Sequence, residues 1–203
     1  MSDDGAPPLV VGISGASGAV LGVRLLQACR ELGVATRLVV SRAAVLTLSE
    51  ELGLDLARVA GMADACDRAG DMGAATASGS FATRGMVVIP CSVRTMSEIA
   101  SGVTSSLLTR AADVTLKERR RLVLVVRESP LHLGHLRTMA QLAEMGAVIA
   151  PPMPAFYARP SSLEDVVDQA VGRALDLFGL DWARVRRWGR DVGPTPAVGD
   201  AGA

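Results

Sequence analysis

The 203-residue sequence has few of the side chains on which several protein classes depend. Its three cysteines, Cys29, Cys66 and Cys91, are widely spaced and odd in number. This pattern argues against a disulfide framework or a zinc site and indicates a reducing compartment. His132 and His135 are the only histidines, so no metal site built from protein ligands is expected.

Net charge and long apolar runs are also missing. The 21 acidic residues cancel the 21 basic residues, which speaks against a nucleic-acid or membrane partner. No apolar run is long enough to span a bilayer, and residues 1–5 are acidic rather than basic. These features together predict a soluble, cytoplasmic protein.

Lysine and tyrosine are the scarcest functional residues. Lys117 is the only lysine among the 21 basic residues, and Tyr157 is the only tyrosine. Codon bias toward arginine explains most of this imbalance. A single lysine can also mark a place where a compact ammonium suits a phosphate better than a planar guanidinium does, and both interpretations stay open at this point.

What the sequence does have is an alternation of short apolar runs with segments of helical periodicity. Strands are predicted at 9–13, 36–40, 86–90, 122–126 and 147–150. Helices are predicted at 19–32, 42–52, 107–118, 136–145 and 161–177, the last of them opened by a capping box from Ser161 to Glu164. Residues 64–84 are rich in Gly, Ala and Ser and are predicted to form loops.

This alternation predicts one α/β domain over residues 9–190. The expected architecture is a three-layer sandwich of the flavodoxin-like Rossmann type with a mainly parallel sheet. Residues 1–8 and 191–203 are expected to be flexible ends.

In such folds, ligands bind where the parallel strands end. The first predicted strand runs into the glycine-rich loop 15–18, whose following helix could offer N–H groups to a phosphate. The spacing matches neither the dinucleotide fingerprint nor the P-loop, so a phosphate site and a simple tight turn stay equally open. Ser41 ends the second strand, where capping the next helix is its more common role.

The third predicted strand ends in residues 90–95, whose hydroxyl groups suit the polar edge of a planar heterocycle. Cys91 is expected to be inert packing, because no histidine lies near it in sequence. Arg110, Asp113, Lys117 and Glu118 recur at helical spacing on the next helix. The residues alone therefore indicate an α/β domain that binds a phosphorylated ligand.

Several segments taken together are far more specific than any one of them. They are residues 12–19, 78–80, 90–95, 107–120, 126–128, 135–136, 146–149 and 154–157. On these segments the chain resembles the flavin prenyltransferases of the UbiX type, formerly described as subunits of hydroxyarylic-acid decarboxylases. The resemblance extends over roughly residues 9–190.

The resemblance implies a definite reaction. Members bind reduced FMN and dimethylallyl monophosphate, attach the C5 unit to flavin N5 and close a ring onto C6. The prenylated FMN passes to a UbiD-type decarboxylase, and no metal is needed. The resemblance also implies a homo-oligomer, usually a dodecamer, with active sites where subunits meet.

The resemblance also assigns residue roles. The implied FMN-binding residues are Gly15, Ala16, Ser17, Ser41, Ser92, Val93, Arg94, Thr95 and Arg127. The implied ligands of the prenyl phosphate are Ser78, Lys117, Arg127, Tyr157 and Arg173. The implied catalytic residues are Ser17, Glu51 and Lys117, with Glu50 as the alternative to Glu51 if the register slips by one residue. Ring closure requires a base, which is either Glu51 or the released phosphate.

The chain departs from the family pattern in two places. Met72 stands where some relatives carry a large aromatic residue, which leaves the steering of ring closure less defined. Arg121 and Val126 stand where relatives often have proline, and we expect no effect because both flank a buried strand.

Two other functions are less well supported. A flavin-dependent cysteine decarboxylase of the same fold would need a catalytic histidine and an asparagine motif that residues 90–95 lack. A non-catalytic accessory subunit of a decarboxylase would not be expected to retain the implied site residues Glu51, Lys117, Arg127, Tyr157 and Arg173.

Overall fold

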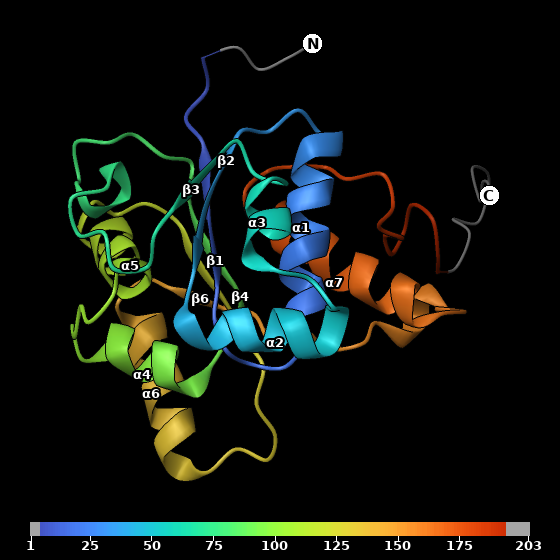
Figure 1. The fold of residues 1–203 in the computed structure, drawn as a ribbon. Helices are drawn as coiled ribbons and strands as arrows, with labels where there is room; N and C mark the ends of the chain where they lie inside the picture. The colour runs from blue at the N-terminus through green and yellow to red at the C-terminus, as the bar shows by residue number, and fades with distance from the viewer. Residues whose placement is uncertain (1–4, 194–203) are drawn as a thin grey trace, which may run out of the picture.

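The computed structural model describes residues 5–193, and the structural statements below refer to that part of the chain. Residues 1–4 and 194–203, which include most of the predicted flexible ends, lie outside it. Six strands form one sheet in which every pairing is parallel (Figure 1). In chain order they are β1 (Leu9–Ile13), β2 (Thr36–Val40), β3 (Ala65–Asp67), β4 (Gly85–Cys91), β5 (Leu122–Val126) and β6 (Val148–Ile149).

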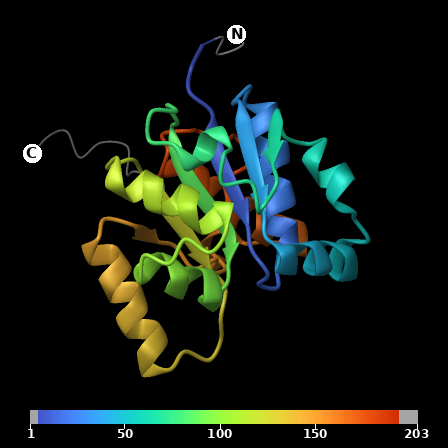
Figure 2. The ribbon, with the colours of Figure 1, turned by 60° about the vertical axis from the view of Figure 1, so that its left-hand side comes forward.

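Helices cover both faces of this sheet (Figure 2). One face carries α1 (Ala19–Glu31), α2 (Arg42–Leu52), α3 (Leu56–Ala60) and α7 (Leu163–Asp176). The other face carries α4 (Val93–Ala100), α5 (Leu107–Lys117) and α6 (Leu133–Glu144). The layers follow from the strand pattern, because Leu9, Val11 and Ile13 enter the first buried cluster and Val10 enters the second. The predicted three-layer sandwich is confirmed.

The strand order β3-β2-β1-β4-β5-β6 places β1 at the centre of the sheet. Without the three-residue edge strand β3, this is the order of flavodoxin-like folds. Strands β2 and β3 are added on one side of β1, and β4, β5 and β6 are added on its other side. The order of the strands therefore switches between β1 and β4, which are neighbours. The crevice at the carboxyl ends of these two strands is therefore the expected ligand position.

Close packing of α1 on the sheet depends on Gly22. A Cβ at this position would lie 2.6 Å from the carbonyl oxygen of Ile89 and 2.8 Å from the side chain of Ile13. The helix thus approaches the β1–β4 pair as closely as backbone contact allows, and the position of its first turn is fixed relative to the strand ends.

Several predicted boundaries are wrong, each for a local reason. Helix α4 was not predicted, because only eight residues form it and its start, Ser92, serves as a cap directly after β4. Strand β4 continues through Pro90 to Cys91 instead of ending at the proline. Strand β3 lies within the segment 64–84 that was predicted to be loop.

Helix starts differ as well. Helix α6 begins at Leu133 rather than at residue 136, because the Nδ1 atom of His132 accepts hydrogen bonds from two backbone N–H groups and caps it. The capping box of α7 joins Ser162 and Asp165, one residue later than predicted. Within the described residues, no helix is both long and apolar enough to cross a membrane.

Candidate functional site

The loops that follow four strands meet at one edge of the sheet. The backbone N–H of Ser41 donates to the Ile13 carbonyl at 2.9 Å, and the N–H of Arg127 donates to the Cys91 carbonyl at 3.1 Å. These bonds continue the sheet by one residue beyond the strand ends. They bring together the loop 14–18, Ser41, the start of α4 and Arg127, as expected for parallel strands.

Ser14 joins the two central loops. Its hydroxyl donates to the Pro90 carbonyl at 2.9 Å and accepts from the Ser92 N–H at 2.7 Å. Ser14 is fully buried, so the bond to Pro90 is shielded from water, whereas the bond to Ser92 is partly buried at the cavity edge. Sequence reasoning did not single out this residue, since its hydroxyl is matched to groups 76 and 78 residues away.

Glu51 closes the N-terminal end of α1. Gly18 precedes the helix in a left-handed conformation and offers no side-chain cap. Instead the Glu51 carboxylate, reaching across from α2, accepts from the N–H groups of Gly18 and Ala19, each at 2.9 Å. Ser17 also hydrogen-bonds to this carboxylate. The helix N-terminus that the sequence offered to a phosphate is therefore already paired with a carboxylate.

The surroundings of Glu51 keep it ionised. Burial alone would raise its pKa, but the hydrogen bonds from Ala19, Gly18 and Ser17 act in the opposite direction. The positive charge of Arg127 adds to their effect, and the pKa of Glu51 lies below its ordinary value. Glu51, Ser17 and Arg127, which the sequence placed in one site, are thus close together.

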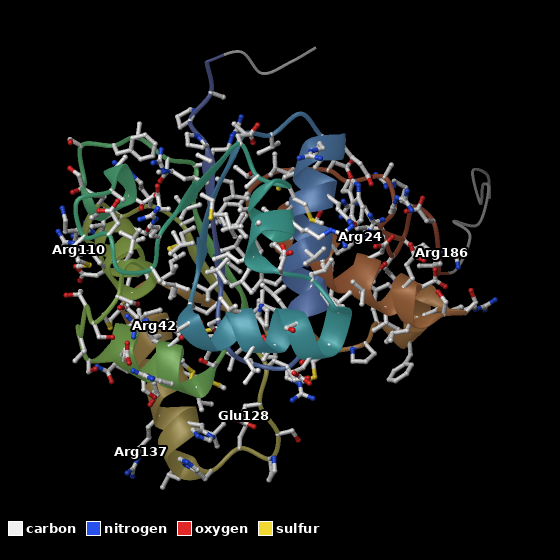
Figure 3. The ribbon with its side chains drawn as sticks, in the orientation of Figure 1. Arg24, Arg42, Arg110, Glu128, Arg137 and Arg186 are labelled. Atoms are coloured by element: carbon white, nitrogen blue, oxygen red, sulfur yellow. The ribbon has the colours of Figure 1, made fainter. Side chains whose placement is uncertain are left out.

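A cavity of about 380 Å³ opens beside this edge. Its lining includes five of the predicted FMN-binding residues, Gly15, Ser41, Ser92, Arg94 and Thr95. The N-terminal ends of α2, α4 and α5 all border it, and each begins with a serine cap. Arg42 and Ser106, which the sequence did not single out, also line the cavity. Figure 3 shows Arg42 at the start of α2 and Arg110 on α5.

The cavity wall contains a carboxylate that the sequence did not reveal. Glu98 accepts from Arg94 Nε at 2.9 Å and from the Ser105 hydroxyl at 2.6 Å. These hydrogen bonds hold the pKa of Glu98 below its usual range. Glu98 thereby ties α4 to the loop that precedes α5. The lining of the cavity includes three helix N-termini and two arginines, Arg42 and Arg94, but only one carboxylate, Glu98. Positive groups thus outnumber negative ones, which is the character of an anion site.

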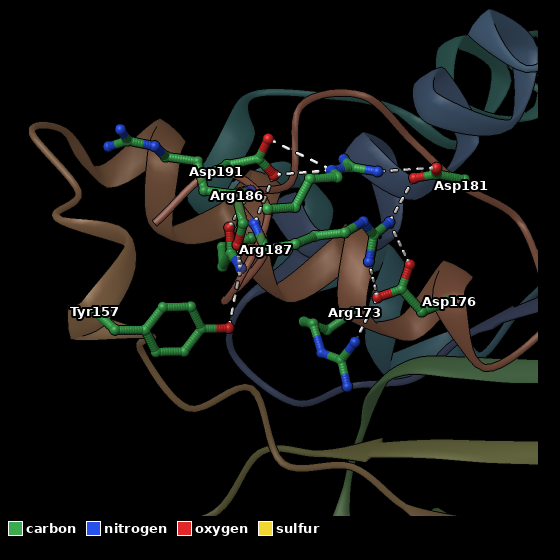
Figure 4. Close-up of polar contacts among 9 residues, drawn as sticks. Tyr157, Arg173, Asp176, Asp181, Arg186, Arg187 and Asp191 are labelled. Atoms are coloured by element: carbon green, nitrogen blue, oxygen red, sulfur yellow. Dashed lines mark hydrogen bonds and ion pairs between the residues drawn. The ribbon is translucent and has the colours of Figure 1, made fainter. Parts of the chain in front are cut away.

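Tyr157 and Arg173 lie together elsewhere on the molecule. Both line a groove of about 650 Å³ between α7 and the loop 150–157. Both also line a smaller hollow beside residues 185–188. Figure 4 shows the two side chains on the same side of α7. Arg173 pairs with Asp176. The phosphate ligands predicted at these two positions are therefore neighbours.

Ser78 and Lys117 lie at the opposite end of the sheet from the cavity. Helix α5 starts at the cavity and runs antiparallel to the strands, so its 11 residues carry Lys117 roughly 16 Å away. Lys117 pairs with Glu118, and both side chains lie against Gly79, next to Ser78. Within one chain, the structure does not bring these two residues to Arg127 or to the cavity.

Comparison with known proteins decides the family. The Flavoprotein family model matches residues 1–175. A protein of Escherichia coli K12 named flavin prenyltransferase UbiX is 59% identical over 173 residues, which cover 85% of this chain and 92% of that protein. This chain is a member of the UbiX-type flavin prenyltransferase family.

Two solved UbiX-type structures share the fold. The crystal structure of AnUbiX (PadA1) in complex with FMN and dimethylallyl pyrophosphate has a TM-score of 0.89 and 49% identity, covering 90% of this chain and 97% of that one. A dodecameric FMN-dependent UbiX-like decarboxylase of Escherichia coli O157:H7 has a TM-score of 0.87 and 49% identity, covering 89% and 98%.

Family membership favours the flavin prenyltransferase over the alternative functions. No group of three or more potential metal ligands occurs among residues 5–193. Burial raises the pKa of the Cys91 thiol to about 12, so Cys91 is packing rather than a nucleophile in this UbiX-type protein.

Proposed function

We propose that this protein transfers a dimethylallyl group from dimethylallyl monophosphate to N5 and C6 of reduced FMN and so forms prenylated FMN. The observation that carries the proposal is the 59% identity to a flavin prenyltransferase over 85% of the chain. The neighbour with a TM-score of 0.89, solved with FMN and dimethylallyl pyrophosphate, supports FMN and a phosphorylated dimethylallyl donor. The monophosphate itself is what the family resemblance implies.

The cavity at the strand ends suits FMN. Gly15, Ser41 and the segment Ser92–Thr95 supply hydroxyl and backbone groups for the flavin, together with Ala16, Ser17 and Arg127. Arg42 and Arg94, with the three helix N-termini, provide positive potential for the phosphate of FMN. Bound reduced FMN supplies the electron-rich ring that accepts the allyl group.

The prenyl phosphate requires a second set of donors. The allyl group leaves its phosphate in this reaction, and positive groups accelerate that step by stabilising the negative charge that develops on the departing phosphate. Arg127, Arg173 and Lys117 are cations, and Tyr157 and Ser78 carry hydroxyl groups. We assign these five residues to the prenyl phosphate.

Glu51 and Ser17 can move a proton near the flavin loop. Glu51 is ionised at neutral pH and is hydrogen-bonded to Ser17, so the pair can accept a proton but does not store one. This supports Glu51 as the base for ring closure, with the released phosphate as the other candidate. The side chain of Glu50 has no hydrogen bond or ion pair in the part of the chain described, which favours Glu51 in this role.

A complete site requires more than one chain. Lys117 and Ser78 lie roughly 16 Å along α5 from the cavity, and Tyr157 and Arg173 line a separate groove. Exposed apolar side chains are available for assembly, among them Leu133, Leu136, Met153 and Phe156. Helix α6, which carries two of them, projects from the body of the molecule (Figure 2). We therefore infer a homo-oligomer with sites between subunits. The dodecameric state of the UbiX-like neighbour supports assembly of this chain.

The product would serve a UbiD-type decarboxylase. We place the protein in the cytoplasm, because Cys29, Cys66 and Cys91 are all free thiols.

The proposed reaction is tested under anaerobic conditions with purified protein and reduced FMN. Dimethylallyl monophosphate and dimethylallyl pyrophosphate are supplied in parallel, and the flavin is extracted for mass spectrometry. The proposal predicts a flavin heavier by one C5H8 unit with the monophosphate. An unchanged flavin mass with both donors would rule out flavin prenyltransferase activity.

A further inference from the structure

Gln169 on α7 is a buried polar side chain that connects Tyr157 to the C-terminal segment 185–192. It is only 6% exposed. Its Oε1 accepts from the backbone N–H of Arg186 at 3.1 Å, and its Nε2 donates to the Arg186 carbonyl at 3.0 Å. This side-chain amide therefore pairs with one residue of the segment as a neighbouring strand would.

The pairing fixes which end of the amide faces Tyr157. If the amide were turned over, its NH2 group would oppose the Arg186 N–H and its oxygen would oppose the Arg186 carbonyl. The nitrogen is therefore the donor, and its second hydrogen is directed to the Tyr157 hydroxyl oxygen, with 3.5 Å between the two heavy atoms. Because that oxygen receives a hydrogen bond, the tyrosine's own O–H is left to donate elsewhere.

The segment that holds Gln169 is itself firmly attached. Arg187 forms ion pairs with Asp176 and Asp181, both at 2.6 Å, and Figure 4 shows its guanidinium between these two carboxylates. Trp188 packs edge-on against the Tyr157 ring, with 5.8 Å between the ring centroids. Tyr157, Arg173 and Trp188 all line the hollow of about 360 Å³ under this segment.

We propose that Gln169 is a positioning residue that orients the Tyr157 hydroxyl as a hydrogen-bond donor toward the phosphate of the prenyl donor, beside Arg173. This inference rests on the proposed function in one respect, the assignment of Tyr157 to that phosphate. Gln169 itself does not contact the phosphate. It acts by donating a hydrogen bond to the hydroxyl oxygen of Tyr157, so that the hydrogen of this hydroxyl points to the phosphate of the prenyl donor.

The test measures the binding of dimethylallyl monophosphate to protein loaded with oxidised FMN, by titration calorimetry, so that no turnover is required. Tyr157→Phe is expected to raise Kd roughly tenfold, since a hydrogen bond to a charged group is lost. Gln169→Leu is expected to raise Kd about threefold to tenfold. The double variant should bind no worse than Tyr157→Phe alone, because Gln169 acts through the hydroxyl.

Two further measurements separate positioning from a purely structural effect. Arg190→Ala loosens the C-terminal segment by removing its ion pairs with Asp181 and Asp191. It touches neither the amide nor Asp176, which pairs with Arg173, so its Kd should stay within about twofold of the native value. Hydrogen exchange of residues 185–192 reports directly whether the segment stays seated in each variant. If Arg190→Ala weakens binding as much as Gln169→Leu does, the effect passes through the segment and the proposal is wrong.

The remaining outcomes are also decisive. Additive losses in the double variant would show that Gln169 acts independently of the hydroxyl and would overturn the proposal. An unchanged Kd in Tyr157→Phe would overturn it too, by removing Tyr157 from the phosphate site. Neither result depends on whether the protein prenylates FMN, which the product mass tests separately.

Discussion

The carboxylate of Glu51 closes α1 by accepting a 2.9 Å hydrogen bond from the backbone N–H of Gly18, 33 residues earlier in the chain. The same carboxylate oxygen accepts from Ala19. The loop 15–18 is thus held in place by one of the two candidates for the base of ring closure. One side chain positions the flavin loop and carries the negative charge next to it.

Glu51→Gln should change how stability depends on pH. The pKa of Glu51 is lowered in the folded protein, so its ionised form adds stability above the ordinary glutamate value of 4.5. That contribution is lost when the pH falls from 4.5 to below the pKa that Glu51 has in the folded protein, because the carboxylate is then protonated. Because glutamine mimics the protonated acid, urea midpoints of native and variant protein should differ at pH 7 and converge at acid pH.

Glu50→Gln provides the matched control for this experiment. It removes the same charge one residue away, and Glu50 is exposed. Its urea midpoint should follow that of the native protein at every pH. If both variants show the same pH dependence, the effect comes from net charge and not from the cap on α1.

Ser14→Ala should destabilise the fold and weaken FMN binding together. The change removes the partner at 2.7 Å of the partly buried Ser92 N–H, which costs about 1 kcal/mol in the free energy of unfolding. Urea unfolding and FMN titration measure the two effects. Ser49→Ala, on the exposed side of α2, should change the free energy of unfolding by less than about 0.5 kcal/mol.

Gly15→Ala should impair the flavin loop specifically. A Cβ at this position would lie 2.4 Å from the Cβ of Ala43 at the start of α2, so the loop must shift away from the cavity. We expect FMN affinity to fall at least tenfold in a fluorescence titration. Gly61→Ala, whose Cβ would meet nothing closer than 3.5 Å, should bind FMN like the native protein.

Lys117→Ala should weaken use of the prenyl donor more than binding of FMN. Lys117 is far from the cavity within its own chain, so it is expected to act in a neighbouring subunit. Chains carrying Lys117→Ala and chains carrying Arg127→Ala, each poorly active alone, should regain activity when co-expressed and isolated as mixed oligomers. Arg121→Ala is the control for loss of a nearby positive charge.

Mixed oligomers that stay as inactive as the parents would place Lys117 and Arg127 in the same subunit's site. A collapse of FMN affinity in Lys117→Ala would instead move this lysine to the flavin phosphate. Both outcomes would contradict the assignment made above.

The sequence predicted the central strands and the long helices because their apolar residues repeat with a clear period. Helix α4 escaped prediction because it is only eight residues long and follows β4 directly, although Val93, Met96 and Ile99 recur at helical spacing. The bonds of Ser14 and Glu51 could not be predicted, because they join groups distant in sequence.

For the predicted site residues, the positions that follow from strand topology could be predicted, and the contacts between subunits could not. Ser41, Ser92 and Arg127 follow parallel strands, so their meeting at one edge could be predicted from topology. The separation of Lys117 also follows from topology, because a helix between parallel strands returns to the opposite edge. How one subunit completes the site of another depends on surface shape, which a single sequence does not specify.

The most direct test of the account uses a dimethylallyl monophosphate labelled with deuterium in its C5 unit. After anaerobic incubation with the native protein and reduced FMN, the extracted flavin is analysed by mass spectrometry. The mass of the extracted flavin should increase by the mass of the fully labelled C5 unit. Flavin recovered at the mass of unmodified FMN, from protein shown to bind both ligands, would contradict the central claim.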